Sequence, residues 1–404
     1  MPVVTAELSS SNTATQNGAA VQAAMTAAGS GGGVLFPSGT FDCLDGWIER
    51  GVTLSAPNTT LRHPDGTTAK HILSNQLVGT TANTTAGSAD VTVSSSGWVS
   101  TYLAVGDMVA IAEAGVTYDA TALAHISTVI AISGATVTLA DVVPKSVTGK
   151  NITRGAGGWT IEGLTLDGNR GPTDSPNANV YPLYMLLCRL ATVDSVTAHS
   201  GDHAGFFLLA SWDNYLTDVE AYDCGQPASQ LGGALWLFGD CRRNVVRRAT
   251  ITGDCFEGLV VDDRSTGVNE YDGAPNDNSF TECTVTIDAR QYDTSAAVVI
   301  VGGNRTRLES STISGADIGV AIAPGVQGTS RGNVGTQVVG NLITDCGEGV
   351  NAYLNNTKAV IDANEFTSCD TNITDTSGSS IIGTNTRAAR LARQARIDGA
   401  WSPR

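Results

Sequence analysis

The chain has 404 residues and a formal charge of −16, from 23 basic and 39 acidic side chains. This balance argues against a nucleic-acid binder, because phosphates are bound by basic surfaces. Charged residues make up 15% of the chain, below the roughly 25% of an ordinary globular domain, so little exposed helical surface is expected. The longest apolar stretches, such as residues 183–187, are far shorter than the ~20 residues of a membrane span. The composition predicts a folded, β-rich protein without membrane insertion.

The first elements are a helix and a glycine-rich strand. Residues 12–28 place apolar side chains on one helical face, and the sequence GGGVLFPSGTF follows at 31–41. This pair resembles the opening of pectate-lyase-like right-handed parallel β-helix proteins, including many bacteriophage tailspikes. The resemblance implies that the helix caps the open end of a solenoid and that residues 1–77 form the cap and the first rungs.

Residues 78–146 have a different pattern. Short alternating strands, among them 88–93, 105–111 and 135–139, are separated by glycine-rich turns. This spacing predicts a small antiparallel β-barrel inserted between early rungs. Similar inserts occur in many tailspike-like and polysaccharide-processing β-helices, so the resemblance extends along the chain to about residue 386.

A short repeat dominates residues 147–386. An apolar residue is followed three and five positions later by small or apolar residues, and this pattern recurs at intervals of 23 to 34 residues. The eight copies begin at Ile161, Val193, Leu216, Val246, Phe280, Leu308, Val338 and Ile361. Most copies are followed by a turn and a second apolar strand that tends to open with glycine. The repeat predicts an all-β fold, a right-handed single-stranded parallel β-helix, in which each unit is one rung.

Carboxylates are the strongest candidates for catalysis. Aligning the second strands on their first glycine places Asp262 and Asp263 where other rungs carry mostly apolar residues, and burying two unpartnered carboxylates would be costly. Glu257 lies on the same rung, and His203 lies in the equivalent turn two rungs earlier. Paired carboxyl groups about 5 Å apart suit a retaining glycosidase, and groups about 6.5 to 9.5 Å apart an inverting one. The alternative is structural, with the carboxylates paired to nearby arginines of the segment 242–248 or to backbone N–H groups.

Carbohydrate binding is predicted from aromatic and polar side chains near the same rungs. Trp212 and Tyr271 are the expected surface aromatics, and Asp254 and Arg264 the expected polar contacts. Phe207 and Trp236 could also line one side of the solenoid, but their apolar surroundings favour core positions.

The sequence contains no metal-ligand or nucleophile motif, and no metal site is predicted. No cofactor is required by the residue pattern. Whether the protein uses Ca²⁺ stays open, because pectate lyases, which share the expected fold, usually require this ion.

Residues 387–404 form an arginine-rich tail unlike the rest of the chain. Four arginines recur every third position, which describes a short cationic helix: Arg387, Arg390, Arg393 and Arg396. One interpretation is a lid over the last rung with solvated arginines. The other is a docking peptide for an acidic partner, such as a second copy of the chain or another virion protein.

The preferred interpretation is a phage-type tailspike or tail-fibre β-helix that binds a bacterial surface polysaccharide, with depolymerisation left open. The resemblance implies a homotrimer. The absence of a secretory signal favours a virion protein assembled in the host cytoplasm over an extracellular enzyme. The cap begins within about a dozen residues of Met1, which leaves no room for an N-terminal virion-attachment domain. The alternatives are a non-enzymatic virion component, such as a capsid decoration or minor tail protein, and a bacterial polysaccharide lyase or glycoside hydrolase.

Overall fold

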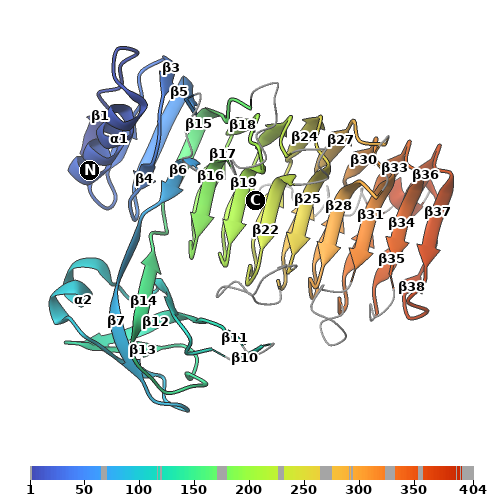
Figure 1. Ribbon diagram of the computed structural model, residues 1–404. Helices are drawn as coiled ribbons and strands as arrows, with labels where there is room; N and C mark the ends of the chain where they lie inside the picture. The colour runs from blue at the N-terminus through green and yellow to red at the C-terminus, as the bar shows by residue number, and fades with distance from the viewer. Residues whose placement is uncertain are drawn as a thin grey trace, which may run out of the picture.

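The computed structural model describes residues 2–64, 71–115, 117–118, 121–170, 180–225, 232–263, 275–290, 292, 294–323, 333–353, 358–387, 389–391 and 393. Its main body is a solenoid of three parallel strand ladders, and a small barrel lies beside the first rungs (Figure 1). The predicted fold class, an all-β parallel β-helix with a cap helix and an inserted barrel, is confirmed.

Two of the three ladders share a twenty-stranded sheet. The first ladder consists of β1 (Val3–Thr5), β2 (Gly33–Leu35), the start of β5 (Thr53–Arg62), the start of β15 (Thr160–Asp167), β17 (Thr192–Asp194), β20 (Tyr215–Thr217), β23 (Val245–Arg247), β26 (Ser279–Thr281), β29 (Arg307–Glu309), β32 (Gln337–Val339), β35 (Val360–Asp362) and β38 (Ile381–Ile382). The second consists of β3 (Gly39–Asp42), the ends of β5 and β15, β18 (Thr197–His199), β21 (Glu220–Tyr222), β24 (Thr250–Gly253), β27 (Thr284–Ile287), β30 (Thr312–Ser314), β33 (Leu342–Thr344) and β36 (Glu365–Thr367).

The third ladder is a separate ten-stranded sheet. It consists of β4 (Gly46–Ile48), β6 (His71–Asn75), β16 (Tyr181–Leu186), β19 (Ala204–Leu209), β22 (Gly233–Phe238), β25 (Glu257–Asp262), β28 (Ala296–Val301), β31 (Ile318–Ala323), β34 (Glu348–Ala352) and β37 (Thr371–Asp375).

The sequence repeat corresponds to the rungs. Ile161 pairs with Val193, Val193 with Leu216, and Leu216 with Val246, and the register continues in the same way to Ile361. All eight first positions are fully buried in one continuous core. Each rung therefore buries its apolar side chains against those of its neighbours, as expected of a solenoid.

Asparagine side chains stack at one bend of the rungs. The amide oxygen of Asn244 accepts hydrogen bonds from the backbone N–H of Asn214 (3.1 Å) and from its side chain (2.9 Å). Asn278 repeats both contacts to Asn244 at 3.1 Å. All three side chains are completely buried, so each satisfies backbone groups that no water could reach.

The barrel is closed by six strands and carries one helix: β7 (Leu77–Thr84), β8 (Asp90–Val93), α2 (Ser96–Tyr102), β9 (Met108–Ile111), β12 (His125–Ser133), β13 (Thr136–Leu139) and β14 (Val147–Gly155). A two-stranded hairpin, β10 (Thr117–Tyr118) and β11 (Thr121–Ala122), lies between β9 and β12. Because β14 pairs with β7, the insert extends to Gly155, beyond the predicted end at residue 146.

The first helix, α1 (Ala14–Ala28), lies at the N-terminal end of the solenoid (Figure 1). Thr13 and Gln16 form a capping box at its start, and Val21, Ala24 and Met25 pack into the solenoid core. The predicted cap is therefore present. Within the part of the chain that the structure describes, no helix combines the length and apolarity needed to span a membrane.

Candidate functional site

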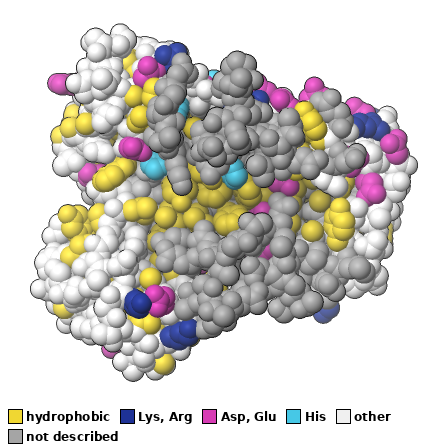
Figure 2. Space-filling view, in the orientation of Figure 1, with side chains coloured by type: hydrophobic (Ala, Val, Ile, Leu, Met, Phe, Trp, Pro, Cys, Tyr) yellow, Lys and Arg dark blue, Asp and Glu magenta, His cyan; other side chains and the backbone are white. Residues whose placement is uncertain are grey.

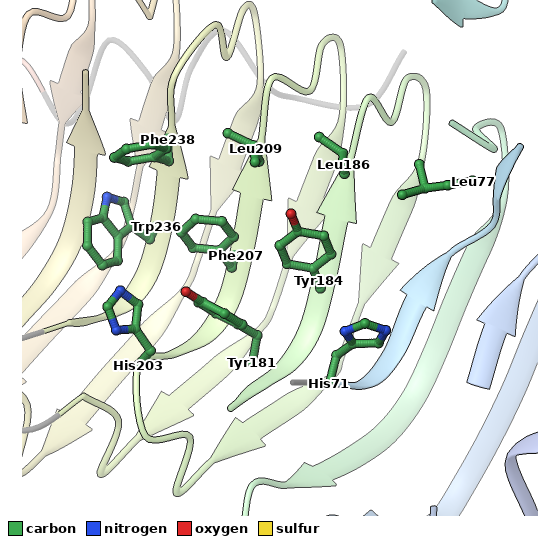
Figure 3. A pocket seen from close by; sticks show the side chains of 10 residues that line it. All are labelled: His71, Leu77, Tyr181, Tyr184, Leu186, His203, Phe207, Leu209, Trp236 and Phe238. Carbon is green, nitrogen blue, oxygen red and sulfur yellow. The ribbon is translucent and has the colours of Figure 1, made fainter. Parts of the chain in front are cut away.

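Three parallel rows of side chains cover the outer face of the third ladder near the barrel (Figure 3). The middle row is aromatic: Tyr184, Phe207 and Trp236 lie on β16, β19 and β22 and are directly paired in register. One flanking row is apolar: Leu77, Leu186, Leu209 and Phe238. The other flanking row is polar: His71, Tyr181 and His203. The rows exist because every second residue of a strand points outward and parallel strands place equivalent positions side by side.

These ten residues line a cavity of about 450 Å³. The barrel forms part of its wall, because Leu77 comes from β7 and because Met108, Ala110 and Ile126 pack in one cluster with the outer side chains of β16 and β19. In the space-filling view, apolar side chains line a hollow between the barrel and the solenoid, and histidines lie at its border (Figure 2). The volume falls in the usual range of small-molecule sites.

An ion pair and a hydrogen bond connect the barrel to the solenoid. Asp107 lies 2.9 Å from Arg50 of the solenoid, and Arg189 donates to the carbonyl of Gly106 at 3.0 Å. Asp107 is 91% buried at its side chain, which shields this pair from solvent. The wall formed by the barrel is thus fixed in position relative to the ladder.

The rings of the cavity contact one another continuously. The ring of Phe207 stacks on Tyr184 with centroids 5.6 Å apart and meets Tyr181 at 4.6 Å. The ring of His203 stacks on Trp236 at 5.0 Å with only 12° between the planes. Such packing fixes the ring orientations, so a ligand meets a preformed aromatic surface.

Burial keeps His203 and Tyr184 uncharged, whereas the Nε2 atom of His71 lies 3.3 Å from the carboxylate of Asp45. Burial lowers the pKa of His203 to about 4 and raises the pKa of Tyr184 to about 12. At neutral pH the imidazole and the phenol are therefore both neutral. Among the described residues that line the cavity there is no Lys, Arg, Asp or Glu.

Two predicted catalytic carboxylates border this cavity at β25. Asp262 is paired in register with Phe238, and Glu257 with Gly233, which is itself paired with Ala204 beside His203. The outer rows of the cavity therefore continue into Asp262 and Glu257, with Val260 extending the aromatic row. The register corrects the sequence alignment by one residue in this rung, since Asp262 pairs with Phe238 and not with Leu237.

The geometry separates these carboxylates from one another. Glu257 and Asp262 are five residues apart on one strand, or about 16 Å, which is too far for an acid and base that act on the same bond. Asp262 is 1% exposed and Asp263 4% exposed. The Asp263 carboxylate lies over Gly302 of the next rung, where an added Cβ would come within 2.1 Å of Oδ2. Asp262 and Asp263 are adjacent, and their catalytic role stays a prediction, as do the separate roles predicted for Glu257 and His203.

The predicted sugar-binding residues are placed differently from expectation. Trp212 was expected on the surface, but it is 4% exposed, donates to the carbonyl of Asp240 at 2.7 Å, and lies under Arg242 at 4.4 Å. Asp254 lies 3.6 Å from Arg170 and does not line the cavity. Tyr271 and Arg264 lie outside the described residues.

Phe207 and Trp236 also correct the sequence analysis. Both were expected in the core, but their side chains point outward and line the cavity (Figure 3). A continuous apolar run does not show which of its residues face inward. The paired aromatic residues Phe206 and Phe207 were the available signal, since adjacent strand residues must face opposite sides.

The arginines of the segment 242–248 pair with acidic residues of neighbouring rungs or turns. The ion pairs are Arg242 with Asp240 (2.6 Å), Arg243 with Asp213 (2.6 Å), Arg247 with Glu282 (3.0 Å) and Arg248 with Asp218 (2.5 Å). Arg243, Arg247 and Arg248 connect neighbouring rungs, Arg242 pairs within its own turn, and the charges of all four are balanced by partners within the chain. No group of three or more His, Cys, Asp or Glu within the described ranges is arranged to hold a metal ion.

The arginine-rich tail contacts its own solenoid. Arg390 pairs with Glu365 at 2.8 Å, and Arg393 pairs with Glu309 at 2.6 Å. Glu309 lies on β29, several rungs before the last one, so the tail runs along the solenoid and does not only cover its end. These two arginines are therefore paired and not solvated, contrary to the lid interpretation. Arg387 is exposed, and Arg396 lies outside the described residues.

Solved structures share this architecture at low sequence identity. ORF18 of Geobacillus virus E2 matches with a TM-score of 0.56 and 12% identity, over 95% of this chain and 60% of that one. The pectate lyase Pel9A matches with a TM-score of 0.51 and 11% identity, over 93% of this chain and 77% of that one. The tailspike gp61 of Pseudomonas phage phi297 matches with a TM-score of 0.47 and 12% identity, over 87% of this chain and 68% of that one.

The fold is therefore the pectate-lyase-like parallel β-helix, and this chain spans 60% of the length of the Geobacillus virus protein. No protein-family model matches the sequence, and no curated protein matches it.

Proposed function

We propose that this protein is a tailspike-type, virion-associated protein that binds a bacterial surface polysaccharide in the cavity between the barrel and the third ladder. The observation that carries the proposal is the preformed row of Tyr184, Phe207 and Trp236, flanked by histidine and tyrosine side chains that can form hydrogen bonds. Sugar rings stack on aromatic faces, and neutral histidine and tyrosine side chains can bond their hydroxyl groups. The viral origin of one protein with the same fold supports the virion assignment.

A binding assay with matched variants tests this proposal. Purified capsular and cell-wall polysaccharides are titrated against the protein by calorimetry. We expect Trp236→Ala to weaken binding at least tenfold, because it removes one ring of the row. Tyr215 is an aromatic residue on β20 that is 50% exposed and does not line the cavity, so Tyr215→Ala is the control and should bind normally. Equal affinity of both variants would contradict the proposed site.

Depolymerisation is the second candidate, because the rows of the cavity lead directly to Asp262. The test compares Asp262→Asn and Asp263→Asn with Asp240→Asn, which changes an equally buried carboxylate one rung earlier. Loss of cleavage in Asp262→Asn and Asp263→Asn, with cleavage retained in Asp240→Asn, would support an enzyme. Retained polysaccharide binding without any cleavage would support a non-enzymatic virion component.

The homotrimer and the attachment to other virion proteins belong to the same proposal. The first is tested by sedimentation of the full chain. Among the arginines of the tail that the structure describes, Arg387 is the exposed one, so a partner contact would be sought there first.

A further inference from the structure

The cavity differs chemically from one side to the other. The aromatic row of Tyr184, Phe207 and Trp236 forms its floor. On one side the floor is bordered by Leu77, Leu186 and Leu209, whose side chains can neither donate nor accept a hydrogen bond. On the other side lie Tyr181 and His203, which can donate and accept hydrogen bonds. His71 lies on the same side, with its Nε2 atom 3.3 Å from the carboxylate of Asp45 and its other ring nitrogen not engaged by that pair. A sugar ring on the floor therefore meets one apolar edge and one polar edge (Figure 3).

We propose that the cavity selects an uncharged sugar with one apolar edge, a 6-deoxyhexose, whose methyl group lies against the leucine row. This inference rests on the proposed glycan-binding function. The stacked ring would place its hydroxyl groups toward the row of His71 and His203. Its C6 methyl group would then replace water at the leucine row, where burial of apolar surface is favourable.

Ordinary hexoses and uronic acids fit this cavity less well. A C6 hydroxyl group against leucine side chains loses its hydrogen bonds to water without replacement. A C6 carboxylate would lose far more, because the described lining provides no Lys or Arg and the chain carries a net charge of −16. The arginines nearest in sequence, such as Arg243, are already paired with acidic residues of the chain.

Two matched series of small glycosides test this selectivity. The first is methyl β-D-fucoside, methyl β-D-galactoside and methyl β-D-galacturonoside, which differ only at C6. The second is the same comparison in the gluco configuration. Dissociation constants are measured by NMR titration of the full chain. In at least one series we expect the 6-deoxy sugar to bind about tenfold more tightly than the hexose, and the uronate not to bind.

A leucine variant connects the selectivity to the apolar row. Leu77 is 37% exposed, so Leu77→Gln should fold normally while it places a hydrogen-bonding group beside C6. We expect this variant to reduce the tenfold preference to less than threefold. Leu190 is 51% exposed and does not line the cavity, so Leu190→Gln should keep the preference.

The outcomes distinguish the proposed selectivity from the proposed glycan binding on which it rests. Equal affinity for the 6-deoxy sugar and the hexose, or tighter binding of the uronate, would overturn the selectivity while leaving glycan binding intact. An unchanged preference in Leu77→Gln would overturn the role of the leucine row. If no glycoside binds in either series and Trp236→Ala leaves polysaccharide binding unchanged, both proposals fail. If no glycoside binds but Trp236→Ala does weaken polysaccharide binding, the selectivity alone is overturned.

Discussion

The imidazole of His203 stacks on the indole of Trp236, with ring centroids 5.0 Å apart and an angle of 12° between the planes. This contact joins the turn before β19 to the middle of β22 and forms one border of the cavity. It also places a titratable group in an apolar setting, with the consequence that burial holds the pKa of His203 at about 4.

Stability should therefore fall in mildly acidic solution. The unfolded chain binds a proton at His203 near pH 6.5, whereas the folded chain binds it only near pH 4, so the stability present above pH 6.5 is lost as the pH falls toward 4. We expect His203→Phe, which keeps a ring on Trp236, to reduce the loss between pH 7 and pH 4.5 by about 2 kcal/mol. Urea unfolding at the two pH values measures this difference. The same pH dependence in both proteins would contradict the assignment.

The tail should stabilise the solenoid through Arg393 and Glu309. Glu309 is 6% exposed, and its carboxylate lies 2.6 Å from the guanidinium group of Arg393. A double-mutant cycle with Arg393→Ala and Glu309→Ala should give a coupling free energy of about 1 kcal/mol in thermal unfolding. Arg387→Ala, at an exposed position of the same tail, is the control and should change little. Purely additive effects would show that the tail does not bind here in solution.

The asparagine stack should be sensitive to a single apolar substitution. Asn244→Leu removes the acceptor for the backbone N–H of Asn214 and the donor to the carbonyl of Ser211 (2.7 Å). Because both groups are buried, we expect a loss of about 2–4 kcal/mol in the free energy of unfolding. Asn151 is exposed on β14, and Asn151→Leu should stay within about 0.5 kcal/mol of the wild type. A small effect of Asn244→Leu would mean that water or a shifted backbone replaces the lost partners.

The position of the barrel should affect ligand binding. Asp107→Ala removes the ion pair with Arg50 and the hydrogen bond from the backbone N–H of Ala104 (2.8 Å). We expect the loosened wall to weaken polysaccharide binding several-fold, as measured by calorimetry. Glu113 is exposed and pairs with Lys150 of the same barrel, without a contact to the solenoid in this pair. Glu113→Gln should therefore bind the polysaccharide normally. Normal binding by Asp107→Ala would show that the Asp107 contacts are not needed to position this wall of the site.

The rungs were predictable from sequence, and the cavity was not. The repeat that begins at Ile161 specified the inward positions, because a solenoid repeats its core residues at every turn. The strands of the third ladder are apolar on both faces, so Phe207 and Trp236 could not be told from core residues by hydropathy. The alignment of β22 slipped by one residue because Gly233 pairs with Ala204, so the glycine of β22 stands one position before the equivalent of Gly205.

The site also depends on contacts that no local pattern contains. Leu77 reaches the cavity only because the barrel folds back onto the ladder, and Trp212 is buried because the side chain of Arg242 covers it. Both are tertiary arrangements between segments that the sequence shows only as separate elements. The carboxylates at 262 and 263 were found because they interrupt an apolar run. The register places Asp262 beside Phe238 of the cavity, and the catalytic role of the two aspartates stays a prediction.

The pairing of Leu77 with Gly155 has a consequence for how this molecule could diversify. The insert starts and ends on neighbouring residues, so the solenoid does not have to open to accommodate it. A barrel of another sequence could be exchanged at these two positions while the ladder stays unchanged. One wall of the cavity is then a permanent part of the scaffold and the other an interchangeable module, which would allow a lineage to change its ligand by exchanging only the segment between Leu77 and Gly155.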